Sequence, residues 1–123
     1  MSETTEYRVP VQAIEEIVIE VSDLDRAIAF YQGVVGLTLR SRGPQEAWFM
    51  VGDQWLAVFE KGREGIGPHF AFRVDEEDVE RVRRTMEAQG IPVETLDYSG
   101  GPSVYIRDPD GNKIELHGKR TEA

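Results

Sequence analysis

The feature that most constrains the fold is an internal repeat with a period of about 53 residues. Gly36 and Gly90, which each end a predicted helix, lie 54 positions apart. Glu16 and His69, each on the strand before such a helix, lie 53 positions apart. A constant spacing of this size indicates one structural unit present twice. Two unrelated α+β pieces could match by chance, but helix starts, helix ends and hairpins recur together here.

Both copies contain the same predicted elements in the same order. Alternating apolar and polar residues predict strands, and apolar residues three and four apart predict one helix after the first strand of each copy. The sequence therefore predicts an α+β fold of two β-α-β-β-β modules within a single domain, residues 1–123. The first module covers residues 11–61, a glycine-rich linker covers 62–68, and the second module covers 69–118.

Capping and turn residues predict where several elements begin and end. Ser22 is the predicted N-cap of the first helix, and Asp75 is the predicted N-cap of the second. Residues 91–96 are predicted to form a strand, and residues 97–102 a glycine-rich loop.

Two predicted hairpins each gather distinctive side chains on one face of the sheet. A two-residue turn at Gly52 and Asp53 in the first module places five residues on one face: Trp48, Met50, Trp55, Ala57 and Phe59. In the C-terminal hairpin, Pro109 and Gly111 suit a type I turn followed by a left-handed residue. The resulting register sets Tyr105 opposite Glu115 and gathers four residues on the face away from the helix: Tyr105, Lys113, Glu115 and His117.

Composition excludes several functional classes. The chain has 123 residues, 40% of them hydrophobic and 30% charged, which is typical of a soluble globular domain. A net charge of −9 without a basic cluster argues against nucleic-acid binding. No apolar run is long enough to span a membrane and no signal pattern is present, so we expect a cytoplasmic protein. The absence of cysteine excludes disulfide and thiol chemistry in the chain itself.

Three ligand-type side chains fall on the face away from the predicted helices. Superposing the two copies places Glu16 on His69, and Glu115 lies on the last strand of the second module. Imidazole and carboxylate groups are common ligands of divalent metals. Three such ligands leave positions open for a substrate oxygen, which the metal can polarise.

Structural alternatives exist for each of these side chains. His69 could be a structural histidine, and Glu16 or Glu20 could form an ion pair with Arg73 on a neighbouring strand. His117 and Lys113 fit a salt bridge at the rim of the face better than acid–base catalysis.

The chain resembles the vicinal oxygen chelate superfamily, also called the glyoxalase, bleomycin-resistance and extradiol dioxygenase group. The resemblance extends over nearly all of residues 11–119. It rests on four stretches: Val21-Ser22-Asp23-Leu24-Asp25-Arg26-Ala27-Ile28-Ala29-Phe30-Tyr31, Gly36-Leu37, His69-Phe70-Ala71-Phe72-Arg73-Val74 and Asp108-Pro109-Asp110-Gly111-Asn112-Lys113-Ile114-Glu115-Leu116.

The resemblance implies a cupped, mostly antiparallel sheet with helices on its outer face, commonly in a homodimer. It also implies one divalent metal ion, with ligand positions that map to Glu16, His69 and Glu115. The first position is usually histidine or glutamine in metal-binding members. The candidate ions are Mn, Fe, Zn, Ni and Mg, and a second carboxylate favours the harder ions Mn²⁺, Mg²⁺ and Fe²⁺.

No subfamily matches the chain at every position. The fourth metal ligand of glyoxalase I enzymes would fall at Ala57, which cannot coordinate. In the fosfomycin-resistance transferases, residues matching Ser99 and Tyr105 hold the antibiotic, but a threonine and a lysine of that subfamily are replaced here by Val18 and Thr95. Extradiol dioxygenases share the histidine and glutamate positions but are usually longer and have two histidines.

The sequence therefore predicts a metal-dependent enzyme acting on an oxygenated small molecule, with isomerase, lyase, transferase and dioxygenase chemistry all open. Glu16 or Glu115 would move a proton, and Tyr105 would position the substrate. The expected substrate contacts are Trp48, Trp55, Phe59, Ser99 and Tyr105. The alternative is a metal-free protein that sequesters a small hydrophobic or cationic ligand, as bleomycin-resistance proteins do.

Overall fold

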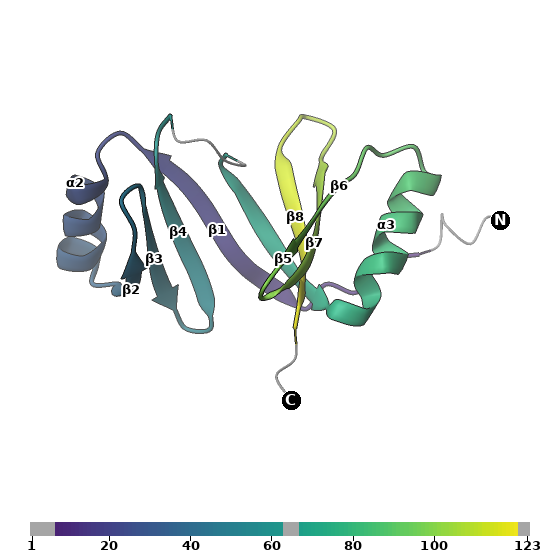
Figure 1. Ribbon diagram of the computed structural model, residues 1–123, viewed down its shortest axis with the longest axis horizontal. Helices are drawn as coiled ribbons and strands as arrows, with labels where there is room; N and C mark the ends of the chain where they lie inside the picture. The colour runs from purple at the N-terminus through teal and green to yellow at the C-terminus, as the bar shows by residue number, and fades with distance from the viewer. Residues whose placement is uncertain (1–6, 63–66, 121–123) are drawn as a thin grey trace. The chain divides into compact units, whose positions relative to one another are not determined.

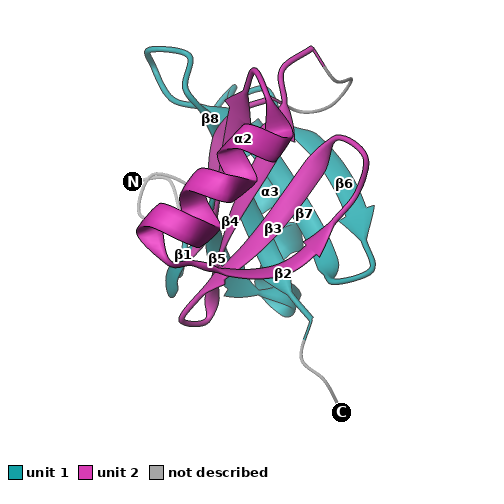
Figure 2. Cartoon of the chain, turned by 90° about the vertical axis from the view of Figure 1, so that its left-hand side faces the viewer, with its two compact units in different colours: residues 1–14, 71–123 teal, residues 15–70 magenta. Residues whose placement is uncertain are grey.

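The structure is a computed structural model that describes residues 7–62 and 67–120. The chain folds into two compact units, coloured separately in Figure 2. Unit 2 consists of residues 15–70, and unit 1 consists of residues 1–14 together with 71–123. Most of the predicted linker lies outside the described residues. The predicted module boundaries therefore stay a prediction.

Unit 2 contains a helical segment and four strands in the order β2-β3-β4-β1. The pairs β2–β3 and β3–β4 are antiparallel, and β1–β4 is parallel. The first two residues of β1 belong to unit 1. The elements are β1 (Ala13–Val21), α2 (Leu24–Ile28), the π-helix η1 (Ala29–Val35), β2 (Thr38–Arg42), β3 (Glu46–Val51) and β4 (Gln54–Glu60).

The core of unit 2 lies between its helix and one face of its strands (Figure 1). Leu24 and Ile28 of α2 pack against Phe49 and Val58, which are fully buried. The predicted register of the β3–β4 hairpin is confirmed, since Trp48 pairs with Ala57. The aromatic residues predicted to share a face therefore lie on the side of the sheet away from this core.

Unit 1 contains strands in the order β5-β8-β7-β6 and the second helix. The pairs β6–β7 and β7–β8 are antiparallel. Its elements are β5 (His69–Asp75, whose first two residues belong to unit 2), the 3-10 helix η2 (Glu76–Asp78), α3 (Val79–Ala88), β6 (Glu94–Tyr98), β7 (Gly101–Arg107) and β8 (Lys113–Lys119).

The core of unit 1 is made mainly of valines from its helix and strands. Val79 and Val82 of α3 pack against Val104 and Leu116 of β7 and β8. Figure 1 shows α3 lying along these strands. The hairpin register predicted from the sequence is confirmed, because Tyr105 pairs with Glu115. With the two units combined, the predicted α+β class and the mostly antiparallel strand pairing are confirmed.

Both predicted N-caps need correction. Asp23, not Ser22, caps α2, and its Oδ1 accepts a hydrogen bond from the backbone N–H of Arg26 at 3.1 Å. Asp75 occupies the N-cap position of η2 without capping it through its side chain. Its Oδ1 instead accepts a hydrogen bond from Nε2 of Gln12 at 2.8 Å, which ties the segment before β1 to the end of β5.

The strand after α3 was predicted too early. β6 covers Glu94–Tyr98, whereas residues 91–96 were expected to form the strand. Pro92 lacks a backbone N–H, so residues around it cannot supply a complete strand ladder. The predicted loop 97–102 is correspondingly shorter, since β6 and β7 join through only Ser99 and Gly100. In the described part of the chain, no helix is long and apolar enough to cross a membrane.

Candidate functional site

His69 is held in one orientation by the backbone just before it. Its Nδ1 lies 2.7 Å from the carbonyl oxygen of Gly67, and its side chain is only 5% exposed. A carbonyl oxygen can only accept, so Nδ1 carries the hydrogen and the neutral ring keeps its lone pair on Nε2. That nitrogen lies 3.9 Å from Oε1 of Glu16. Metal-binding histidines are typically oriented in this way, with one ring nitrogen donating to a carbonyl group.

Glu16 reaches His69 from β1 within the same unit. In the parallel register of β1 and β4, Glu16 is the partner of Trp55, and Val18 is the partner of Ala57. Val18 and Ala57 are buried. The Glu16 carboxylate is therefore flanked by apolar side chains on its own face of the sheet.

Three aromatic side chains form a cluster on this same face. The ring centroids of Trp48 and Trp55 are 6.1 Å apart and those of Trp48 and Phe59 are 5.8 Å apart, both in edge-to-face geometry. Each of the three residues is partly exposed. Such a cluster offers a ready contact surface for a small apolar or aromatic molecule.

Glu115 lies in unit 1, where it is buried among hydrogen-bonding side chains. The hydroxyl of Ser103 donates to its Oε2 at 2.6 Å. Nδ1 of His117 lies 2.7 Å from the same hydroxyl and 3.7 Å from Oε2. The sequence predicts a salt bridge of His117 at the rim of the face. In the structure His117 instead contacts Glu115 through the hydroxyl of Ser103, and this contact is largely buried.

Tyr105 is buried opposite Glu115 on the neighbouring strand. Its hydroxyl lies 2.6 Å from that of Tyr98. Burial, followed by hydrogen bonding with Tyr98 and the nearby charge of Glu115, raises the pKa of Tyr105 far above its ordinary value. The phenol therefore stays protonated and can act as a hydrogen-bond donor. Lys113 Nζ lies over the ring, 5.3 Å from its centroid.

The structure thus describes two groups of predicted site residues, one in each unit. In unit 2, Glu16 and His69 approach each other, and Trp48, Trp55 and Phe59 form one cluster on the face that carries Glu16. In unit 1, Glu115 and Tyr105 are cross-strand partners. Ser99 lies at the β6–β7 turn, where its carbonyl oxygen accepts from Nη1 of Arg120 at 3.3 Å.

Two site residues were missed in the sequence. Ser103 was treated only as part of a hairpin, although it lies two positions before Tyr105 and so faces the same side of β7. Tyr98 falls within the predicted loop 97–102, whereas in the structure it is the last residue of β6. The strand alternation could have revealed Ser103, whereas Tyr98 required the correct end of β6.

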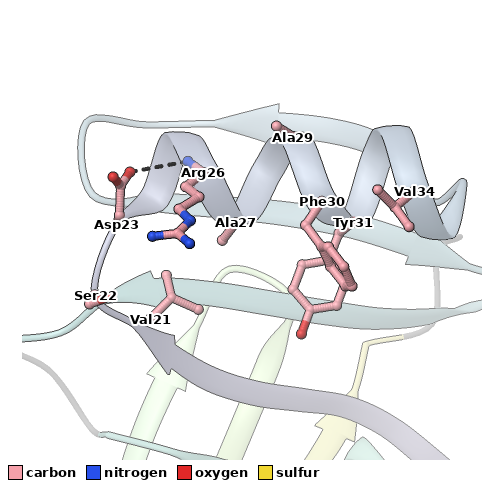
Figure 3. A pocket seen from close by; sticks show the side chains of 9 residues that line it. All are labelled: Val21, Ser22, Asp23, Arg26, Ala27, Ala29, Phe30, Tyr31 and Val34. Atoms are coloured by element: carbon pink, nitrogen blue, oxygen red, sulfur yellow. Dashed lines mark hydrogen bonds between the residues drawn. The ribbon is translucent and has the colours of Figure 1, made fainter.

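Unit 2 also has an open hollow of about 480 Å³, which lies beside α2 and η1 and apart from the candidate site (Figure 3). It contains none of the predicted site residues. Its walls combine exposed apolar side chains of η1 with the polar start of α2: Val21, Ser22, Asp23, Arg26, Ala27, Ala29, Phe30, Tyr31 and Val34.

Comparison with protein families gives a match over most of the chain. Residues 13–116 match the model described as Glyoxalase/Bleomycin resistance protein/Dioxygenase superfamily. Among curated proteins, the chain is 34% identical over 113 residues to glutathione transferase FosA of Serratia marcescens, a match that spans 86% of this chain and 80% of the relative. It is also 34% identical over 116 residues to metallothiol transferase FosB of Lysinibacillus sphaericus, with 87% and 82% covered.

Solved structures share the fold at lower sequence identity. Methylmalonyl-CoA epimerase from Mycobacterium tuberculosis aligns with a TM-score of 0.74 at 21% identity, covering 94% of this chain and 93% of the epimerase. The 2,3-dioxygenase LapB from Pseudomonas sp. KL28 aligns with a TM-score of 0.78 at 24% identity, covering 94% of this chain and 43% of the dioxygenase chain.

Proposed function

The chain belongs to the glyoxalase/bleomycin resistance protein/dioxygenase superfamily, and from this premise we propose that it is a metal-dependent transferase acting on small molecules. The two relatives at 34% identity support this reaction class, because their names describe a glutathione transferase and a metallothiol transferase. In the proposed reaction a thiol sulfur attacks a carbon atom of an oxygenated substrate. The carbon–oxygen bond breaks, and the oxygen takes up the proton that the thiol loses.

Glu16, His69 and Glu115 are the residues proposed to hold the metal, as one imidazole and two carboxylates. This donor set fits a divalent ion such as Mn²⁺, Fe²⁺, Zn²⁺, Ni²⁺ or Mg²⁺, and its two carboxylates favour the harder ions. A bound ion would supply Lewis-acid stabilisation of the substrate oxygen.

The orientation of His69 is the observation that carries this proposal. A histidine with only a structural role at the start of a strand needs a hydrogen bond from its ring and no carboxylate near its second ring nitrogen. Here the bond from Nδ1 to the Gly67 carbonyl oxygen leaves the second nitrogen directed at a carboxylate 3.9 Å away. That separation is too long for a hydrogen bond. It matches two ligands that face a common ion better than a closed ion pair.

Further side chains are proposed to bind and orient the substrate. The aromatic cluster of Trp48, Trp55 and Phe59 would contact its apolar part. Tyr105, a neutral phenol, would position the substrate. Ser99 would add a polar contact, and Glu16 or Glu115 would accept a proton if the thiol needs a base.

Metal content tests the first half of the proposal. Protein purified without chelators or an affinity tag should contain about one equivalent of a divalent metal by elemental analysis. Glu16→Ala and His69→Ala should each lose it, while Glu20→Ala should retain it. Glu20 is a suitable control because it lies on the same strand and the same face as Glu16. Equal metal content in Glu16→Ala and Glu20→Ala would contradict the assignment.

A transfer assay tests the second half. The metal-loaded protein should accelerate the addition of glutathione or cysteine to fosfomycin, the antibiotic of the transferases that the chain resembles, as followed by product mass. A loaded protein that transfers no thiol to this antibiotic would overturn the proposed reaction. A metal-free protein whose tryptophan fluorescence is quenched by aromatic cations would instead support a sequestering function.

We extend the proposal to the assembly and location of the protein. The family resemblance implies a homodimer, and the acidic composition with no cysteine suits the cytoplasm. Light scattering after gel filtration would measure the mass in solution. A monomer of 13.9 kDa would contradict the dimer.

A further inference from the structure

Ser103 bridges two titratable side chains in unit 1. Its hydroxyl lies 2.6 Å from Oε2 of Glu115 and 2.7 Å from Nδ1 of His117. Ser103 and His117 are direct partners in the β7–β8 register, and Glu115 lies two positions before His117 on the same face. Ser103 is only 1% exposed and Glu115 is also buried, so these bonds do not compete with bulk water.

Hydrogen-bond accounting fixes the direction of this chain of contacts. An ionised carboxylate can only accept, so the single hydroxyl hydrogen of Ser103 is directed to Glu115. The serine oxygen must then accept from His117, which places a hydrogen on Nδ1. The series therefore runs from the imidazole N–H to the hydroxyl and from the hydroxyl to Oε2. Bonds to a charged acceptor are the strongest of their kind.

Tyr105, the cross-strand partner of Glu115, also contacts this carboxylate. A hydrogen bond with Glu115 contributes to the raised pKa of Tyr105, and Tyr98 contacts the Tyr105 hydroxyl in turn at 2.6 Å. The Glu115 carboxylate thus has oriented partners on more than one side. A carboxylate held in this way has little rotational freedom left to lose when it binds a ligand.

We propose that Ser103 is a positioning residue for Glu115, backed by His117, and that it sets the orientation in which Glu115 binds the divalent metal. This inference rests on the proposed function, in which Glu115 is a metal ligand. Side chains that orient ligands typically change metal affinity by about 10- to 100-fold when they are removed.

The first experiment compares the Mn²⁺ affinity of the purified chain with that of Ser103→Ala, measured by electron paramagnetic resonance of free Mn²⁺. Ser103→Ala should bind about 10- to 100-fold more weakly. Ser41→Ala, on an exposed part of β2, should bind like the wild type. Affinity of Ser103→Ala within about twofold of wild type would overturn the proposal.

Two variants of His117 distinguish a loss of positioning from a loss of folding. They test the proposal even if Ser103→Ala does not fold. The amide nitrogen of Asn occupies nearly the same place as Nδ1, whereas Leu has similar bulk and no donor. His117→Asn should therefore retain Mn²⁺ affinity within about threefold, and His117→Leu should lose about 10-fold or more. An equal loss in both variants would contradict a donor role.

A readout without metal distinguishes this inference from the proposed function. In the nitrogen-15 spectrum of the metal-free protein, the His117 Nδ1 should carry a hydrogen that exchanges slowly, and Ser103→Ala should make that exchange fast. A wild-type His117 with a bare Nδ1 overturns the inference, whatever the metal result. A wild type with the expected spectrum that binds no Mn²⁺ overturns the metal site and, with it, the positioning role.

Discussion

The Nδ1–H of His69 donates to the carbonyl oxygen of Gly67 at 2.7 Å, and this bond decides which ring nitrogen faces Glu16. Gly67 has a φ of +84°, a left-handed conformation that glycine adopts without strain. The glycine before β5 therefore acts on the candidate metal site through the histidine. It was not visible as a functional position in the glycine-rich linker of the sequence.

Gly67→Ala should weaken both the fold and the metal site. The positive φ costs a side-chain-bearing residue about 1–2 kcal/mol, so the free energy of unfolding in urea should fall by that amount. If the backbone relaxes, the carbonyl turns away from Nδ1, and Mn²⁺ affinity should fall by about 10-fold.

Gly33→Ala is the matched control for that prediction. Neither Gly33 nor Gly67 has any atom within 4 Å of an added Cβ, so the two substitutions differ in backbone conformation and not in steric contact. Gly33 lies in η1 with a negative φ, and alanine there should stabilise the fold by about 0.4–1 kcal/mol. Equal effects of the two substitutions would contradict the role given to the Gly67 conformation.

Local turn chemistry made much of the fold predictable. The Gly52–Asp53 turn fixed the register that pairs Trp48 with Ala57, and the turn containing Gly111 fixed the register that pairs Tyr105 with Glu115. In a strand each register determines which side chains share a face, so both candidate clusters followed from the turns.

Other features depended on competition between alternative hydrogen-bond partners, which the sequence alone does not resolve. Ser22 and Asp23 are both good capping residues, and only the backbone geometry selects Asp23. Asp75 lost its predicted capping bond to a contact with Gln12, which is 63 positions away. Contacts between distant segments override local preference at such positions. Ser103, the hydrogen-bond partner of Glu115, is a different case, because the strand alternation already places it on the same face as Tyr105.

Phe59→Leu should weaken substrate binding without changing the chemical step. The ring of Phe59 packs edge-on against Trp48 in the aromatic cluster, and leucine cannot replace this contact. In the proposed transfer assay the KM for fosfomycin should rise by about 10-fold while kcat stays within about twofold, because the contact is the same in the ground and transition states. Phe30→Leu, on an exposed position of η1, should leave both constants unchanged. A matching rise in KM for Phe30→Leu would contradict the placement of the substrate.

Tyr105→Phe should lose less stability at alkaline pH than the wild type does. The pKa of Tyr105 is raised in the folded chain, chiefly by burial, while the unfolded chain keeps the ordinary value near 10. Above that value the unfolded state loses the proton first, so the stabilising contribution of the neutral phenol declines as the pH rises. Urea unfolding at about pH 8 and about pH 11 should show a steeper decline for the wild type than for Tyr105→Phe. Parallel declines would show that Tyr105 ionises as freely as in the unfolded chain.

Asp108→Asn should destabilise the C-terminal hairpin at neutral pH and much less in acid. Asp108 Oδ1 accepts from the backbone N–H groups of Asp110 and Asn112 at 2.9 and 2.8 Å, and Oδ2 accepts from the Asn112 side chain at 2.8 Å. The side-chain bond from Asn112, followed by the backbone bonds, lowers the pKa of Asp108. A lowered pKa means that the ionised form stabilises the fold above the unfolded value of about 3.9, and that this stabilisation is lost as the pH falls through the folded value. The difference in Tm between wild type and Asp108→Asn should therefore be largest at neutral pH and shrink at about pH 2.

Asp110→Asn, in the same turn, should show a smaller difference at neutral pH, because Asp110 takes part in the turn through its backbone N–H, which asparagine retains. A difference for Asp108→Asn that is equally large at both pH values would show that its charge does not stabilise the turn.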